Sequence, residues 1–154
     1  MNRRIHMLGP ISAVLALGLF SVVGCAATDG SGPQGIKVTL TGDQEVPPVK
    51  TAGRGTGTFV IAADKSISGS ITTTGVDGSV AHIHDSTTGQ MCGAKNGPVI
   101  VPLTKGPNDT WSVAPGAKLT DAQYASYQAG NLYVNVHTAT NKGGEICAKL
   151  VPVK

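Results

Sequence analysis

Short stretches in which apolar and polar residues alternate recur along most of the chain from residue 36 onward. Strict alternation places one set of side chains on each face of an extended strand, so each stretch predicts a strand with one buried face. Clusters of Gly, Asn, Asp and Ser separate the stretches and predict turns. The predicted strands cover residues 36–41, 56–62, 67–74, 80–84, 99–103, 109–113, 132–138 and 145–151.

Residues 119–130 break the alternation and predict one short helix. Thr120 and Gln123 have the spacing of a capping box, in which each side chain bonds the backbone N–H of the other residue. Gly130 is the residue type that most readily ends a helix in the left-handed conformation. The helix therefore lies just before the penultimate strand.

Two further segments predict irregular structure. Pro47 and Pro48 remove donors from a strand ladder, so their segment is an edge or a bend. Residues 85–97 form a long polar loop. Seven or eight short antiparallel strands with one late helix predict an all-β fold, either a Greek-key β-sandwich or a Greek-key barrel.

The composition agrees with this fold class. A chain of 154 residues, 40% hydrophobic and 14% charged, has room for one folded domain. The formal charge of +3 includes Arg3 and Arg4, which lie in a predicted leader; without them 10 basic and 9 acidic residues leave +1. No basic run follows residue 30, which argues against a nucleic-acid partner.

The first residues have the parts of an export signal. A basic start (Arg3 and Arg4) precedes an apolar stretch over residues 11–23, and a small residue precedes Cys25. The apolar stretch is 13 residues long, whereas a membrane-spanning helix needs about 20. The segment therefore predicts a cleaved leader and not a membrane span.

Residues 22–25 (VVGC) resemble the lipobox of bacterial lipoproteins, whose cysteine receives lipid and becomes the mature N-terminus. The resemblance implies a lipoprotein signal peptide over residues 1–24, a lipidated Cys25 and a flexible tether over residues 25–35. Acyl chains then hold the domain of residues 36–154 in the bacterial cell envelope, on the outer membrane or the cell surface, facing outside the cytoplasm.

Two cysteines remain, Cys92 in the long loop and Cys147 in the last strand. In an exported, oxidising compartment such a pair is more often a disulfide than two free thiols. The bridge closes a loop of more than fifty residues, which the chain-entropy relation values at about 4 kcal/mol. Two separate thiols, or two thiolate metal ligands, are the alternatives.

The domain has three histidines, His82, His84 and His137, all on predicted strands. Residues i and i+2 of a strand share one face, about 7 Å apart. His137 also lies on the polar side of its strand. If the two strands are neighbours, three imidazoles meet at one point, and such a set suits copper or zinc better than magnesium or calcium. Histidines on a solvated strand face are the alternative.

Asn135, Asp85 and Glu145 are candidates to orient these rings by hydrogen bonds, or they are solvated. Other chemistry is missing from the sequence: it contains no G-x-S-x-G motif and no P-loop.

Several short segments occur in an order and spacing that resemble the CHRD domain, named after chordin. They are residues 40–42 with 45–49, 81–84, 119–120 with Gln123, 133–138, and 141 with 144–146. The resemblance runs over residues 36–151. It implies an extracellular or envelope β-sandwich module, which in chordin is part of a protein that binds growth factors and in bacteria occurs on many secreted proteins.

A weaker likeness is to the copper-zinc superoxide dismutases, which also place a His-x-His on one strand, a further histidine near the end, and a disulfide between a loop and the last strand. Those enzymes need a bridging histidine and further zinc ligands between the two motifs. Residues 85–135 contain no histidine. The likeness therefore implies a mononuclear copper site and argues against a dinuclear one.

Three functions compete on these observations. The favoured hypothesis is a membrane-anchored lipoprotein that binds copper, or second to it zinc, through the three histidines, to buffer or deliver the ion. The second is an extracellular structural or protein-interaction module without metal, acting on an envelope protein partner. The third is a mononuclear enzyme that resembles superoxide dismutase.

Overall fold

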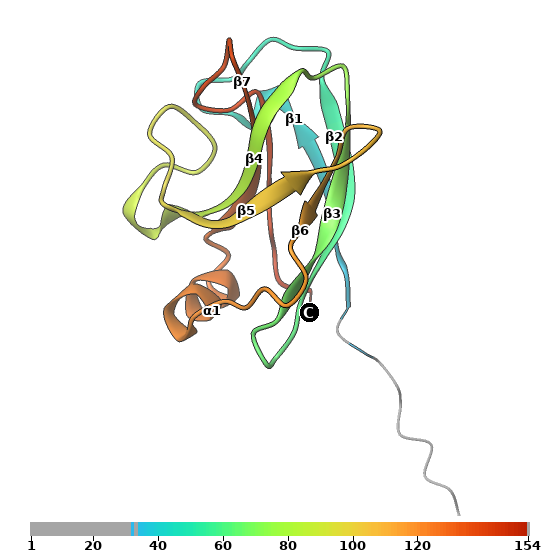
Figure 1. Cartoon of the computed structure of the whole chain (residues 1–154). Coiled ribbons are helices and arrows are strands. Elements are labelled where there is room, and N and C mark those ends of the chain that lie inside the picture. Colours follow the sequence, from blue (N-terminus) through green and yellow to red (C-terminus); the bar gives the residue numbers. More distant parts are fainter. Residues whose placement is uncertain (1–31, 33, 154) are drawn as a thin grey trace, which may run out of the picture. The chain divides into compact units, whose positions relative to one another are not determined.

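The computed structural model describes residue 32 and residues 34–153. The predicted signal peptide, the predicted lipidation site at Cys25 and most of the predicted tether lie outside these residues. The described part forms eight strands, labelled in Figure 1: β1 (Ile36–Thr41), β2 (Arg54–Ile61), β3 (Ile67–Thr74), β4 (Gly78–Asp85), β5 (Val99–Lys105), β6 (Thr110–Val113), β7 (Leu132–Thr138) and β8 (Ile146–Lys149).

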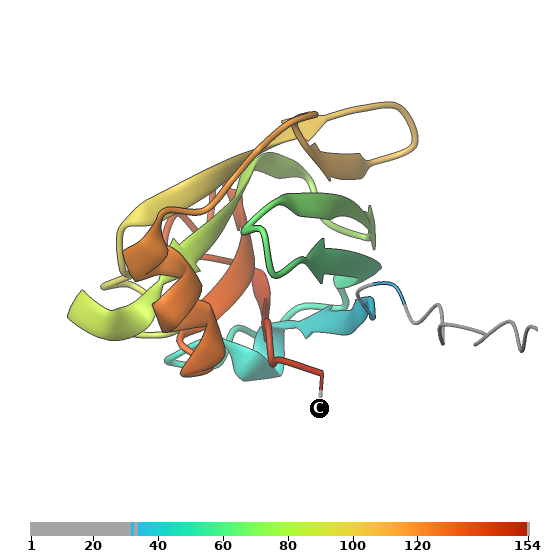
Figure 2. The same cartoon turned by 90° about the horizontal axis from the view of Figure 1, so that it is seen from below.

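The eight strands close into one antiparallel barrel in the order β1-β2-β3-β6-β5-β4-β7-β8. Strands β4, β5 and β6 are sequential neighbours, and β7 returns past them to pair with β4. This arrangement is a Greek key. The all-β prediction is confirmed, and of its two forms the closed barrel is the one observed. Figure 2 shows the strands around the closed barrel from below.

The inside of the barrel holds the main hydrophobic core, built from one face of every strand. Leu40, Phe59, Ile83, Val134 and Ile146 are fully buried there. These residues occupy the apolar positions of the alternating pattern, because successive side chains of a strand point to opposite faces. The alternation thus decides which side chains face inward.

The outer face of β7 does not follow the simple pattern, because all seven of its residues are buried. Tyr133, Asn135 and His137 point away from the barrel interior but lie beneath the β4–β5 connection and the loop that precedes β8. The alternative that Asn135 and His137 are solvated is therefore wrong. The barrel carries a second, polar buried layer on this side.

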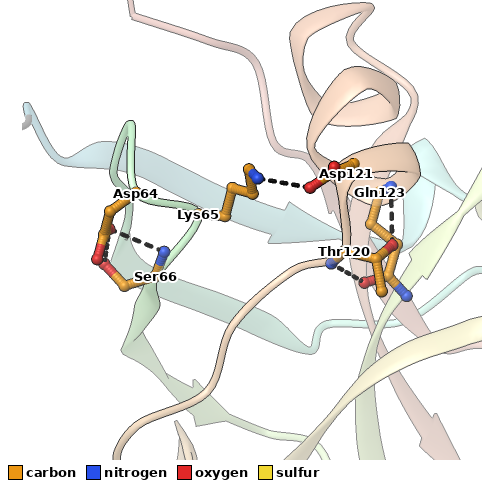
Figure 3. Close-up of polar contacts among 6 residues, drawn as sticks. All are labelled: Asp64, Lys65, Ser66, Thr120, Asp121 and Gln123. Atoms are coloured by element: carbon orange, nitrogen blue, oxygen red, sulfur yellow. Dashed lines mark hydrogen bonds and ion pairs between the residues drawn. The ribbon is translucent and has the colours of Figure 1, made fainter.

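The predicted helix is present as α1 (Asp121–Gln128), with its capping box formed. The Gln123 N–H donates to Thr120 Oγ1 at 3.2 Å, and the Thr120 N–H donates to Gln123 Oε1 at 2.9 Å. Gly130 has a φ of 76°, as the predicted helix stop requires. An ion pair between Lys65 and Asp121 joins the β2–β3 turn to the first turn of α1 (Figure 3).

Asp64 shapes the same β2–β3 turn by accepting hydrogen bonds from the backbone N–H and hydroxyl of Ser66 (Figure 3). No helix in the described part of the chain is both long and apolar enough to cross a membrane.

Replacing Thr120 by alanine removes the cap of α1. We expect Thr120→Ala to lower the free energy of unfolding by about 1 kcal/mol, measured by urea denaturation. Thr120→Ser keeps the capping oxygen and should retain most of the stability. Equal losses in both variants would contradict the capping role.

Candidate metal centre

The three histidines lie together on the outer face of two neighbouring strands. His82 and His84 are on β4, and His137 is on β7. β4 pairs with β7 in antiparallel register, with His84 opposite Tyr133 and His137 opposite Val80. One nitrogen from each ring lies within 4.8 Å of one from each of the others. The predicted meeting of three imidazoles is therefore present.

Two backbone carbonyls orient two of the rings. His84 Nδ1 lies 2.8 Å from the carbonyl oxygen of Gly97, and His137 Nδ1 lies 3.0 Å from that of Lys142. A carbonyl oxygen only accepts, so each Nδ1 carries the proton and donates it. In the neutral rings each Nε2 then has a free lone pair.

These two free nitrogens face each other. His84 Nε2 and His137 Nε2 are 3.3 Å apart in a buried position. Two lone pairs at this separation repel unless a proton or a metal ion lies between them. Two nitrogens bound at 2.0–2.1 Å to one tetrahedral metal ion are separated by about 3.3 Å, so the observed spacing fits shared coordination.

His82 is the less constrained ligand. It is half-buried, and its Nδ1 is buried without a hydrogen-bond partner. The cluster opens into a cleft of about 320 Å³, which Val80, Val99 and Lys142 also line. The site thus offers three nitrogen ligands and an open side.

Burial is the main cause that keeps the rings neutral. It lowers the pKa of His137 to about 4, and the neighbouring His84 adds to the effect. It also lowers the pKa of His84, partly offset by the hydrogen bond to Gly97, and the pKa of His82. Because a ligand nitrogen must be unprotonated, the site is ready for a metal ion at neutral pH.

Within residues 34–153, the three side chains predicted to orient the rings form no hydrogen bond with them. Asn135 donates to the Gly143 carbonyl, Asp85 accepts from Thr87 and Ser126, and Glu145 accepts from Thr51, Thr138 and Asn141. The orienting groups are main-chain carbonyls, which sequence patterns do not identify because every residue carries one. The three polar residues shape the loops that bring those carbonyls into place.

Tyr133 contacts both His84 and the β4–β5 connection, and so holds this connection next to His84. Its ring stacks on the imidazole, with centroids 5.1 Å apart and an interplanar angle of 12°. Its hydroxyl accepts from the Gly97 N–H at 3.1 Å and donates to Asn96 Oδ1 at 2.8 Å. One peptide unit away, the Gly97 carbonyl holds His84. Tyr133 is therefore a positioning residue that the sequence reasoning missed.

Gly97 allows this close approach because it lacks a side chain. A Cβ at this position would collide with the carbonyl oxygen of Asp85. Any larger residue would push the loop away from β4 and withdraw the carbonyl from His84.

The predicted disulfide between Cys92 and Cys147 is confirmed, with a Cα–Cα distance of 5.9 Å and a sequence separation of 55. It ties the β4–β5 connection to β8. Both cysteines pack with Tyr133 and Met91 in a small cluster outside the barrel. The alternatives of free thiols and of thiolate metal ligands are therefore excluded in this structure.

These features of residues 34–153 define an antiparallel β-barrel domain that carries a three-histidine cluster beneath its outer loops. A model of the CHRD domain family matches residues 36–150, and the chain belongs to this family. Membership of the CHRD family is consistent with this domain being an extracellular module. The searches of curated proteins and of solved structures found no match, and the likeness to superoxide dismutases remains one of motif order.

Removing the hydroxyl of Tyr133 should loosen the loop. Tyr133→Phe leaves the Gly97 N–H without its partner, and we expect a loss of about 1–3 kcal/mol in the free energy of unfolding. Tyr127→Phe is the matched control, because Tyr127 is also buried but its hydroxyl makes no hydrogen bond within residues 34–153. Similar losses in both variants would rule out the fastening role.

Acid should destabilise the metal-free protein through His137. Its pKa falls from 6.5 to about 4 on folding, so the unfolded chain binds more protons between these values and stability falls as pH falls through this window. The loss is at most about 3 kcal/mol.

Glu45 acts in the opposite direction, because burial raises its pKa to about 7. The comparison is therefore with His137→Gln, in which the contribution of Glu45 is unchanged. The stability difference between the two proteins, from denaturation curves at pH 4 to 7, should change with pH. A difference independent of pH would contradict the assignment.

Proposed function

We propose that this protein is a membrane-anchored, extracytoplasmic CHRD-domain lipoprotein that binds one copper ion through His82, His84 and His137, and buffers or delivers it. The observation that supports this most is the pair of Nε2 atoms 3.3 Å apart, each on a ring whose Nδ1 donates to a carbonyl. A proton shared between the two nitrogens is the competing explanation. The lowered pKa of His137, about 4, disfavours that proton at neutral pH.

The donor set favours copper and, second, zinc. Imidazole nitrogen suits both ions, and divalent copper binds a given nitrogen site more tightly than zinc does. Three histidines without a carboxylate give no hard oxygen ligand for magnesium or calcium. An open side on the cluster is compatible with uptake and release of an ion.

The anchor is the part of the proposal that rests on the sequence alone. The lipobox-like residues 22–25 support attachment of lipid at Cys25. A disulfide at Cys92 and Cys147 suits a compartment outside the cytoplasm. Together they support a site in the bacterial envelope, where the domain meets metal ions before they enter the cell.

A protein-interaction module is the second candidate. Val80 and Val99 are 44% and 49% exposed and line the histidine cleft, and exposed apolar side chains around a cleft are typical of contact surfaces. An enzyme like superoxide dismutase is the third candidate, and superoxide consumption by the copper-loaded protein would separate it from a carrier.

Metal titration of the purified protein tests the favoured function. We expect one equivalent of Cu(I) or Cu(II) to bind, with Zn(II) weaker, in competition with a chromogenic chelator. The double variant His82→Ala, His84→Ala should bind at least about a hundredfold more weakly, since two of the three ligands are lost.

Lys142→Gln is the control, because Lys142 lines the same cleft and offers only its backbone carbonyl to His137. Its affinity should stay within about twofold of the parent protein, since the substitution alters no ligand. Equal binding by the parent and the double variant would end the metal hypothesis and leave the interaction module.

A further inference from the structure

Asn96 lies between the two loops that carry the ring-orienting carbonyls. It is half-buried, and its backbone precedes Gly97, whose carbonyl accepts from His84 Nδ1. Its side-chain amide donates to the carbonyl of Gly143. The residue before Gly143 is Lys142, which carries the carbonyl that orients the second buried ring. One residue therefore connects both supports of the histidine pair.

The partners of this amide fix which of its ends is the donor. A carbonyl only accepts, so the Gly143 oxygen faces Nδ2 of Asn96. A backbone N–H only donates, and that of Gly93 faces Oδ1 at 3.2 Å. The Tyr133 hydroxyl also donates to Oδ1, at 2.8 Å. One end of the amide thus bonds within the β4–β5 connection and to β7, and the other end bonds to the loop before β8.

The two loops also lie backbone against backbone at this point. A Cβ at Gly143 would lie 2.9 Å from the Cα of Ala94, so a larger residue would push the loops apart. Asn135 adds a second donor to the Gly143 carbonyl, at 3.1 Å, but it projects from β7. Within residues 34–153, Asn96 is the only side chain that forms a hydrogen bond from one loop to the other.

We propose that Asn96 is a positioning residue of the metal centre, because it holds the two carbonyls at fixed positions and so sets the 3.3 Å spacing of His84 Nε2 and His137 Nε2. This inference rests on the proposed function, since it concerns the same ligands. Each carbonyl fixes the rotation of one ring, so a shift of either loop moves one Nε2 atom out of the shared position.

Asn96 also lines the histidine cleft, so a direct role as a ligand is the alternative. Its Oδ1 accepts hydrogen bonds from Gly93, Tyr133 and Asn135, which occupy the lone pairs of that oxygen. Its Nδ2 is a donor and has no lone pair to offer a metal ion. Asn96 therefore acts through the rings.

Metal titration of the purified full chain tests the positioning role. We expect Asn96→Ala to bind Cu(II) and Zn(II) at least about tenfold more weakly than the parent protein, as is typical when a group that orients a metal ligand is lost. Asn131→Ala is the matched control: Asn131 is also half-buried, but its side chain forms no hydrogen bond within residues 34–153, so affinity should not change. A thermal unfolding curve shows whether each variant is folded.

Proton–nitrogen NMR of the metal-free proteins follows each ring separately. In the parent protein the Nδ1–H protons of His84 and His137 should exchange slowly with solvent, because both are hydrogen-bonded. Asn96→Asp keeps the acceptor within the β4–β5 connection but loses the donor to Gly143. It should speed exchange at His137 at least about tenfold and leave His84 nearly unchanged, whereas Asn96→Ala should speed both.

The two measurements separate this inference from the proposed function. Failure of the parent protein to bind metal ends the proposed function, and the exchange rates still decide whether Asn96 positions the rings. Three results overturn the inference: parent-like metal affinity in Asn96→Ala, an equal loss in Asn131→Ala, or unchanged exchange at both rings in Asn96→Ala. Faster exchange at His84 than at His137 in Asn96→Asp also contradicts it.

Discussion

Two main-chain carbonyls, those of Gly97 and Lys142, decide which nitrogen of each buried histidine remains free. Each accepts the proton of one Nδ1, so both Nε2 lone pairs point into the same small space. Without this constraint the imidazoles would be ordinary hydrogen-bonded strand residues. With it, they present two unprotonated nitrogens side by side that could hold a metal ion, and the functional proposal depends on that arrangement.

Neither carbonyl belongs to a strand, and both must be held in place. The Gly97 peptide is held by Tyr133, while the disulfide of Cys92 and Cys147 ties the same connection to β8. The Lys142 loop is held through Glu145, which accepts hydrogen bonds from Thr138 and Asn141 at its base. Polar groups on the outer face of the barrel are therefore buried and paired because they serve as attachment points for loops.

The Greek-key path brings the two halves of the cluster together. β4 and β7 are far apart in the chain but pair along most of their length. β5 pairs with one edge of β4 and β6 follows it, so the other edge of β4 is left for β7. The residue 140–144 segment then separates two places of different chemistry. One cleft contains the three histidines, and the other is lined by Glu45 and Val46 to Val49.

Local sequence determined the strands, the capped helix that begins at Thr120, the inward face of each strand, and the sharing of one face by His82 and His84, because these depend on periodicity and on contacts between near neighbours. The pairing of Cys92 with Cys147 also followed from the count of cysteines. The protonated nitrogen of each ring, the positioning role of Tyr133 and the burial of Glu45 did not follow from the sequence. These depend on backbone groups and loops that meet only when β4, β7 and β8 pair, and a main-chain carbonyl has no signature in the sequence until the fold places it.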